Sequence, residues 1–183
     1  VTYKPKSKTN VNSKLTIFDK AIRNNYIDSD NIHYNSSEKP ISSGSYGKVY
    51  FKDKYAIKIF QNSKNRYWED DMREELSISD HIRHETKNKK QIRYNILPLF
   101  QCTNINKPCV IMPRCDGSIK DLLKNNNLSL ECKYNLCAKI IYVLYSLTLI
   151  KNPVYFTDCK IENIMYIKEN NKLRVAIGDL GSF

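Results

Sequence analysis

Apolar and polar residues alternate along several short runs of this chain, as they do in β-strands with one buried face. Two of these runs, 49–51 and 55–60, flank the polar tripeptide 52–54 and predict a β-hairpin. Gly44, Ser45 and Gly47 predict a turn before it. Further strands are predicted at 96–101, 108–114, 154–156, 164–167 and 173–177.

Apolar residues recur at helical spacing in four other segments. The predicted helices cover residues 15–22, 65–84, 118–124 and 130–150. In the last of them we expect one buried face, formed by Leu136, Cys137, Ile140, Ile141, Leu144 and Leu147. Strands and helices gather in separate parts of the chain instead of alternating, so we predict an α+β fold with two segregated lobes.

Composition and charge narrow the possible partners. The chain has 183 residues, 41% hydrophobic and 27% charged, which excludes a wholly disordered or fibrous protein. The formal net charge of +11 favours a polyanionic partner such as nucleotide phosphates, nucleic acid or an acidic protein. Lys, Ile and Asn have A/T-rich codons, so part of this charge is interpreted as genome bias. Because the basic residues are dispersed and no recognition motif accompanies them, we expect no nucleic-acid partner.

Residues 1–10 are polar and basic and lack the apolar core of a signal peptide, while the longest apolar stretch, 140–150, is too short to span a bilayer. We therefore expect no membrane association and an intracellular location, in the cytoplasm or nucleus. None of the six cysteines lies in a C-x-x-C pair and no His lies at zinc-finger spacing, so we expect buried, reduced thiols. They are Cys102, Cys109, Cys115, Cys132, Cys137 and Cys159.

A glycine-containing segment and a strand lysine together suggest phosphate binding. Residues Ile41–Val49 read ISSGSYGKV, and their two glycines allow the backbone to approach phosphate oxygens. Lys58 lies within the following strand between apolar neighbours, where its ammonium needs a carboxylate to fix its position. Glu75 on the next predicted helix is the candidate, and its neighbour Glu74 is a rival that only the helix register can decide.

The segment Phe156–Met165 carries the sharpest pattern. Asp158 is followed by Lys160 and then Asn163, in a loop between two apolar runs. Phosphoryl transfer needs a carboxylate that orients the hydroxyl nucleophile, a cation at the γ-phosphate and an oxygen ligand for Mg²⁺, and these residues supply the three in that order. Asp179, which leaves the last predicted strand, adds a second oxygen ligand for Mg²⁺.

In this order and spacing, residues 41–183 resemble the eukaryotic-type protein kinase family. The Lys at position 160 resembles the catalytic loop of the Ser/Thr kinases. The resemblance implies ATP and Mg²⁺ as cofactors and phosphoryl transfer to Ser or Thr of a protein substrate. It also implies an N-terminal extension at 1–40, a β-sheet lobe with one regulatory helix and a hinge at 41–115, and the first part of a mainly helical lobe at 116–183.

The resemblance further assigns roles to individual residues. Asp158 would be the catalytic base, Lys160 its partner at the γ-phosphate, and Lys58 the phosphate-binding lysine that Glu75 pairs with. The Mg²⁺ ligands would be Asn163 and Asp179. The implied nucleotide-binding residues, with Met112 as gatekeeper and 113–115 as hinge, are Ile41, Ser43, Gly44, Ser45, Tyr46, Gly47, Val49, Ala56, Lys58, Met112, Pro113 and Cys115.

The chain also departs from the family's pattern. Ser42 replaces the first loop glycine, Leu180 replaces the Phe of the Asp-Phe-Gly motif, and Phe156-Thr157 replaces the His-Arg that docks a phosphorylated activation loop. The sequence ends at Phe183, before an activation segment, so it resembles either a fragment of a longer kinase or a naturally short relative. In its divergence and A/T bias it is similar to kinases of large DNA viruses or of A/T-rich parasites.

A second hypothesis is a truncated kinase mimic or pseudokinase that binds and modulates a partner protein, such as a partner kinase, without turnover. The early end of the sequence favours it, because an uncovered core would expose an apolar patch. The catalytic hypothesis is preferred because all six residues expected to touch phosphate, metal or nucleophile are present. The sequence leaves the oligomeric state open.

Overall fold

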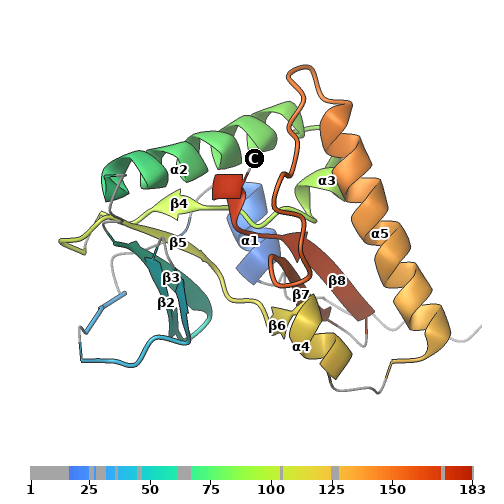
Figure 1. The fold of residues 1–183 in the computed structure, drawn as a ribbon. Helices are drawn as coiled ribbons and strands as arrows, with labels where there is room; N and C mark the ends of the chain where they lie inside the picture. The colour runs from blue at the N-terminus through green and yellow to red at the C-terminus, as the bar shows by residue number, and fades with distance from the viewer. Residues whose placement is uncertain are drawn as a thin grey trace, which may run out of the picture.

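The computed structural model has an α+β fold with two antiparallel sheets. It describes residues 17–24, 27, 32–35, 37–44, 47–61, 67–103, 105–124, 128–169 and 172–182. The larger sheet has five strands in the order β1-β2-β3-β5-β4 (Figure 1). These strands are β1 (Ser42–Gly44), β2 (Gly47–Lys52), β3 (Tyr55–Phe60), β4 (Phe100–Gln101) and β5 (Cys109–Pro113). The smaller sheet consists of β6 (Gly117–Ser118), β7 (Ile164–Glu169) and β8 (Lys172–Ile177), in that order.

Helices account for most of the remaining described residues. They are α1 (Ile17–Asn24), α2 (Trp68–Glu85), α3 (Lys90–Arg93), α4 (Ile119–Lys124) and α5 (Leu130–Thr148), followed by the 3₁₀ turn η1 (Leu180–Ser182). Figure 1 shows η1 beside α2, although the two are far apart in sequence. No described helix is both long enough and apolar enough to cross a membrane.

The hairpin β2–β3 forms because its residues alternate between two buried faces. On one face, Ala56 and Phe60 pack with α2 residues such as Met72 in the largest hydrophobic core. On the other face, Ile57 and Ile59 pack in a second core that includes Ala21 of α1. Strand β3 is therefore covered on both sides, which fixes the direction of each of its side chains.

The long helix α5 is correctly predicted, but its buried face is narrower than expected. Leu136, Val143 and Leu147 are buried, whereas Cys137 is exposed and Ile141 is 67% exposed. Each helical residue turns about 100° from the one before, so these two point well away from the stripe that packs on the cores. The expectation that both lie on the buried face is wrong.

Two of the predicted strands differ from the structure, one entirely and one in part. Residues 154–156 form no strand, because the Val154 amide donates instead to the Leu147 carbonyl at the end of α5 (3.1 Å). Of the predicted strand 96–101, only the two residues of β4 join the larger sheet. Ile96 forms an isolated parallel bridge with Ile177 of β8, so this segment pairs with the smaller sheet.

Candidate functional site

The first cluster of the candidate site surrounds the ammonium group of Lys58. Lys58 lies in β3 between partners Val49 of β2 and Val110 of β5, on the face that α2 covers. Its Nζ contacts the Glu75 carboxylate and lies 3.2 Å from Oδ1 of Asp179. The structure thus brings together three of the predicted site residues, from a strand, a helix and the C-terminal segment.

The helix register selects Glu75 over its rival Glu74. Glu75 is 4% exposed and shares a buried stripe of α2 with Met72, Ser79 and Ile82. These positions are three, four and seven residues from Glu75, so they lie on one face of the helix. The alternative that the sequence left open is therefore decided by the direction of the buried stripe.

Burial and charge act against each other in this cluster. Burial alone would lower the pKa of Lys58, but the attraction of the Glu75 and Asp179 carboxylates more than offsets it and the pKa is raised. Burial raises the pKa of Glu75, and the nearby Lys58 ammonium opposes that shift. Lys58 is consequently held in its charged form between two carboxylates.

The second cluster joins Asp158, Lys160 and Asn163. The Asn163 side-chain amide donates to the Asp158 carboxylate and to the Asp158 backbone carbonyl, both at 3.1 Å. The Lys160 ammonium donates to the same carboxylate, and this hydrogen bond lowers the pKa of Asp158. Asp158 therefore stays ionised at neutral pH, while the side chain of Asn163 is held by both of its bonds.

The segment 178–181 connects the two clusters. The Gly178 amide donates to the Asn163 carbonyl (2.9 Å), and Asp179 follows with a φ of 53°. A Cβ on Gly181 would lie 2.9 Å from the Glu75 carboxylate, so this residue packs directly on the first cluster. Asp179 also attracts the Lys160 ammonium and helps to raise its pKa, after the larger effect of the Lys160–Asp158 hydrogen bond.

Several of the predicted nucleotide-binding residues belong to the largest hydrophobic core or pack against it. Ala56, Met112 and Cys115 lie in the largest hydrophobic core, and Val49 packs against it. Burial, followed by the neighbouring Asp116 carboxylate, raises the pKa of Cys115 to about 12.

Met165 of β7 packs against the same core, and the sequence analysis did not identify it. The only feature of the sequence that points to Met165 is its place in the apolar run that follows Asn163. Pro113 of the predicted hinge is buried at the end of β5.

The predicted glycine loop is described only in part. Ile41, Ser43 and Gly44 are exposed at the edge of the larger sheet, and the two central residues Ser45 and Tyr46 lie outside the described residues. Gly47 differs from these exposed residues, because a Cβ on it would lie 2.4 Å from the Ile59 carbonyl oxygen. Its glycine is thus required by the close approach of β3.

Cysteine burial is correctly predicted for only part of the set. Cys102, Cys109 and Cys115 are buried, Cys132 is half-buried, and Cys137 and Cys159 are exposed.

Within the described part of the chain, no group of three or more His, Cys, Asp or Glu side chains is placed to hold a metal ion by itself. Comparisons with models of known protein families and with curated proteins find no match to this chain.

Proposed function

We propose that this chain catalyses ATP- and Mg²⁺-dependent phosphoryl transfer to Ser or Thr of a protein substrate, in the manner of the eukaryotic-type protein kinases. The observation that carries the proposal is the contact of Lys58 with both Glu75 and Asp179. Lys58 and Asp179 are 121 positions apart in sequence, and the segment of Asp179 is bonded to Asn163 of the second cluster. Chance contacts rarely unite so many residues that suit one reaction.

The arrangement of the elements supports the same proposal. A five-stranded antiparallel sheet carries the lysine on its third strand, and the helix that follows this strand supplies the paired carboxylate. The second cluster precedes β7 in the chain, and Asp179 follows β8. Both strands belong to the smaller sheet, which has α4 and α5 beside it. We interpret residues 41–115 as a β-sheet lobe and residues 116–183 as part of a helical lobe.

Each charged group has a role that its surroundings favour. Lys58, held by Glu75, would bind the phosphates of the nucleotide as a fixed cation. Asp158 is ionised and would accept a hydrogen bond from the substrate hydroxyl, orienting it for attack. Lys160 donates to Asp158 and would stabilise the charge on the transferred phosphoryl group.

The donor atoms near both clusters fit Mg²⁺, which prefers oxygen ligands and takes one or two protein groups together with phosphates. The amide nitrogen of Asn163 is used by Asp158, which leaves its side-chain oxygen as the available ligand. Asp179 supplies a carboxylate that is 37% exposed. When bound, the ion would neutralise phosphate charge.

The test is phosphate transfer from radiolabelled Mg–ATP to casein and to a basic protein. Asp158→Asn and Lys58→Met are expected to lower the rate by about 10²–10⁴-fold, the usual loss for such groups. Asp70→Asn and Lys87→Met, which change exposed residues in and after α2, are matched controls and keep the wild-type rate. Equal transfer by all five proteins, or none by any of them, contradicts the proposal.

One observation favours the second hypothesis, a protein that binds a partner kinase without turnover. Five large apolar residues of α5 and its C-cap are at least 59% exposed, and they recur at helical spacing on one face. They are Leu130, Tyr134, Ile141, Tyr145 and Leu149. Such a face suits contact with another protein. Stoichiometric inhibition of a partner kinase that persists in Asp158→Asn and is lost in Ile141→Asp distinguishes this function from catalysis.

A further inference from the structure

Two cysteines lie directly opposite one another where β4 and β5 continue into their connecting loop. The register pairs Phe100 with Ile111 and Gln101 with Val110, so Cys102 falls opposite Cys109. The Cys102 amide donates to the Cys109 carbonyl at 3.2 Å. In a hydrogen-bonded antiparallel pair the Cα atoms are about 5.5 Å apart, which lies inside the range of about 4.4–6.8 Å that a disulfide spans.

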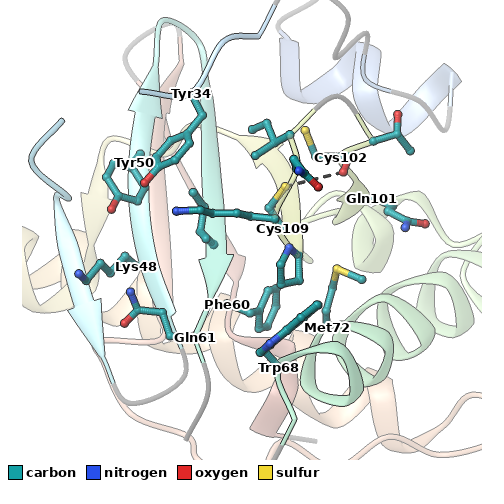
Figure 2. A pocket seen from close by; sticks show the side chains of 16 residues that line it. Tyr34, Lys48, Tyr50, Phe60, Gln61, Trp68, Met72, Gln101, Cys102 and Cys109 are labelled. Atoms are coloured by element: carbon teal, nitrogen blue, oxygen red, sulfur yellow. Dashed lines mark hydrogen bonds between the residues drawn. The ribbon is translucent and has the colours of Figure 1, made fainter. Parts of the chain in front are cut away.

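The two side chains lie on the same face of the hairpin, as directly opposite residues do. Both are buried in the core that also holds Ile57 and Ile111. The Cys109 thiol donates to the Cys102 carbonyl at 3.7 Å, and Figure 2 draws this bond as a dashed line. A hydrogen bond with the Cys102 side chain, and burial after it, raise the pKa of Cys109. The Cys109 thiol therefore already contacts Cys102 in the reduced protein.

A cavity of about 1110 Å³ gives access to this pair, and both cysteines line it (Figure 2). Lys48 of β2 and Lys107 of the connecting loop also line it, and none of its described lining residues is acidic. An anionic molecule is thus attracted to the cavity. Cys102 is 5% exposed and Cys109 is fully buried, so a reagent in the cavity meets Cys102 first.

We propose that Cys102 and Cys109 form a redox-active dithiol that closes to a cross-strand disulfide by exchange with an anionic low-molecular-weight disulfide of the glutathione type. The Cys102 thiolate attacks one sulfur of glutathione disulfide and releases one glutathione thiolate. The Cys109 thiolate then attacks the Cys102 sulfur of the mixed disulfide and releases the second. The cysteines lose two electrons to the glutathione sulfurs, and their two protons pass to the two released thiolates.

The disulfide would restrain residues 103 and 105–108 between the two cysteines, and these residues line the cavity. Trp68 and Met72 of α2 also line the cavity, and Met72 precedes Glu75 by one helical turn. None of the residues of the Lys58 cluster lines this cavity. The proposal concerns a separate modification site and stands whether or not the chain transfers phosphate.

The experiment uses the full chain with the exposed thiols removed, as Cys137→Ser with Cys159→Ser, so that no intermolecular link forms. The reduced protein is incubated with glutathione disulfide and mapped by mass spectrometry without reduction. We expect a Cys102–Cys109 link, with the loss of two hydrogen atoms, to exceed every link to Cys115 or Cys132 at least about tenfold. Its rate should rise roughly tenfold per pH unit between pH 7 and 8, because the thiolate is the attacking species.

Two variants test the order of the steps. Cys109→Ser should accumulate one glutathione adduct on Cys102, since no second thiol resolves it. In Cys102→Ser, Cys109 should form neither adduct nor link while the protein is folded, because it is fully buried. The proposal is overturned if the folded protein keeps both thiols available for alkylation after equilibration with glutathione disulfide. It is also overturned if the link forms only in urea, where the other pairings should compete with it.

Discussion

Removal of the Lys58 ammonium should destabilise the fold through the charges that it leaves behind. The side chains of Lys58 and Glu75 are 13% and 5% exposed, so Lys58→Met leaves Glu75 as a buried, unpaired carboxylate facing Asp179. Breaking a buried pair from one side costs about 3–5 kcal/mol. A chain of this length loses about 2–4 °C in Tm per kcal/mol, so we expect a fall of roughly 6–20 °C.

A second substitution tests whether charge causes this loss. Adding Glu75→Gln to the Lys58→Met protein replaces the ion pair by two uncharged groups. Such a replacement often changes the stability little, so about 2–3 kcal/mol of the lost unfolding free energy should be regained. Glu75→Gln alone should cost less than Lys58→Met, because Lys58 keeps Asp179 at 3.2 Å. The coupling free energy from the double-mutant cycle is therefore expected to be about 2–3 kcal/mol plus the cost of Glu75→Gln alone.

The loss should also depend on pH, with a definite sign. Burial raises the pKa of Glu75 above its ordinary 4.5, and without Lys58 the largest opposing effect is gone. A raised folded-state pKa contributes stability below the unfolded pKa and loses it as the pH rises through the folded value. Urea unfolding followed by circular dichroism should thus show a smaller gap between Lys58→Met and wild type at pH 5 than at pH 7. Additive single costs, within about 0.5 kcal/mol, together with equal gaps at both pH values refute this reasoning.

Three further predictions concern glycine contacts and a buried thiol. Gly47→Ala should lower the unfolding free energy by about 1–3 kcal/mol, because its Cβ would lie 2.4 Å from a backbone oxygen of β3, whereas Gly44→Ala, with nothing within 4 Å, should leave the Tm unchanged. Gly181→Ala should be destabilising only while Glu75 is present; an equal effect in Glu75→Ala would contradict the 2.9 Å contact. Urea unfolding should show stability falling as the pH rises from 9 towards 12, the folded pKa of Cys115, and Cys115→Ala should flatten this slope.

The elements that sequence patterns predicted well are those whose packing is local. The β2–β3 hairpin follows from alternation around the turn at Asp53-Lys54, and Asp53 takes a φ of 53° that Asp tolerates better than most residues. Segments whose partners are distant were predicted poorly. Residues 96–99 have an apolar pattern typical of a strand, yet Leu97 donates to Ile177 of the smaller sheet, a choice that no local pattern contains.

For the candidate site, residue types were easier to predict than their partners. Glu74 and Glu75 could not be separated from sequence because Leu76 and Ile78, both half-buried, blur the apolar stripe of α2. Met165 was missed because an apolar residue in a strand carries no chemical signal. The exposed face of α5 was missed for a related reason, since its apolar residues spread around most of the helix and only packing distinguishes the covered side.

The union of the two charged clusters depends on a short backbone segment. β8 ends at Ile177, and a continued strand would carry Asp179 away from the site. Instead the Gly178 amide is held by the Asn163 carbonyl, and the left-handed φ of Asp179 turns the chain back so that its carboxylate reaches Lys58. Left-handed backbone costs an L-residue about 1–2 kcal/mol, and Asp is among the residues that adopt it most readily. The Lys58–Asp179 contact therefore depends on the backbone at residues 178 and 179, and it should weaken when either charged cluster is altered.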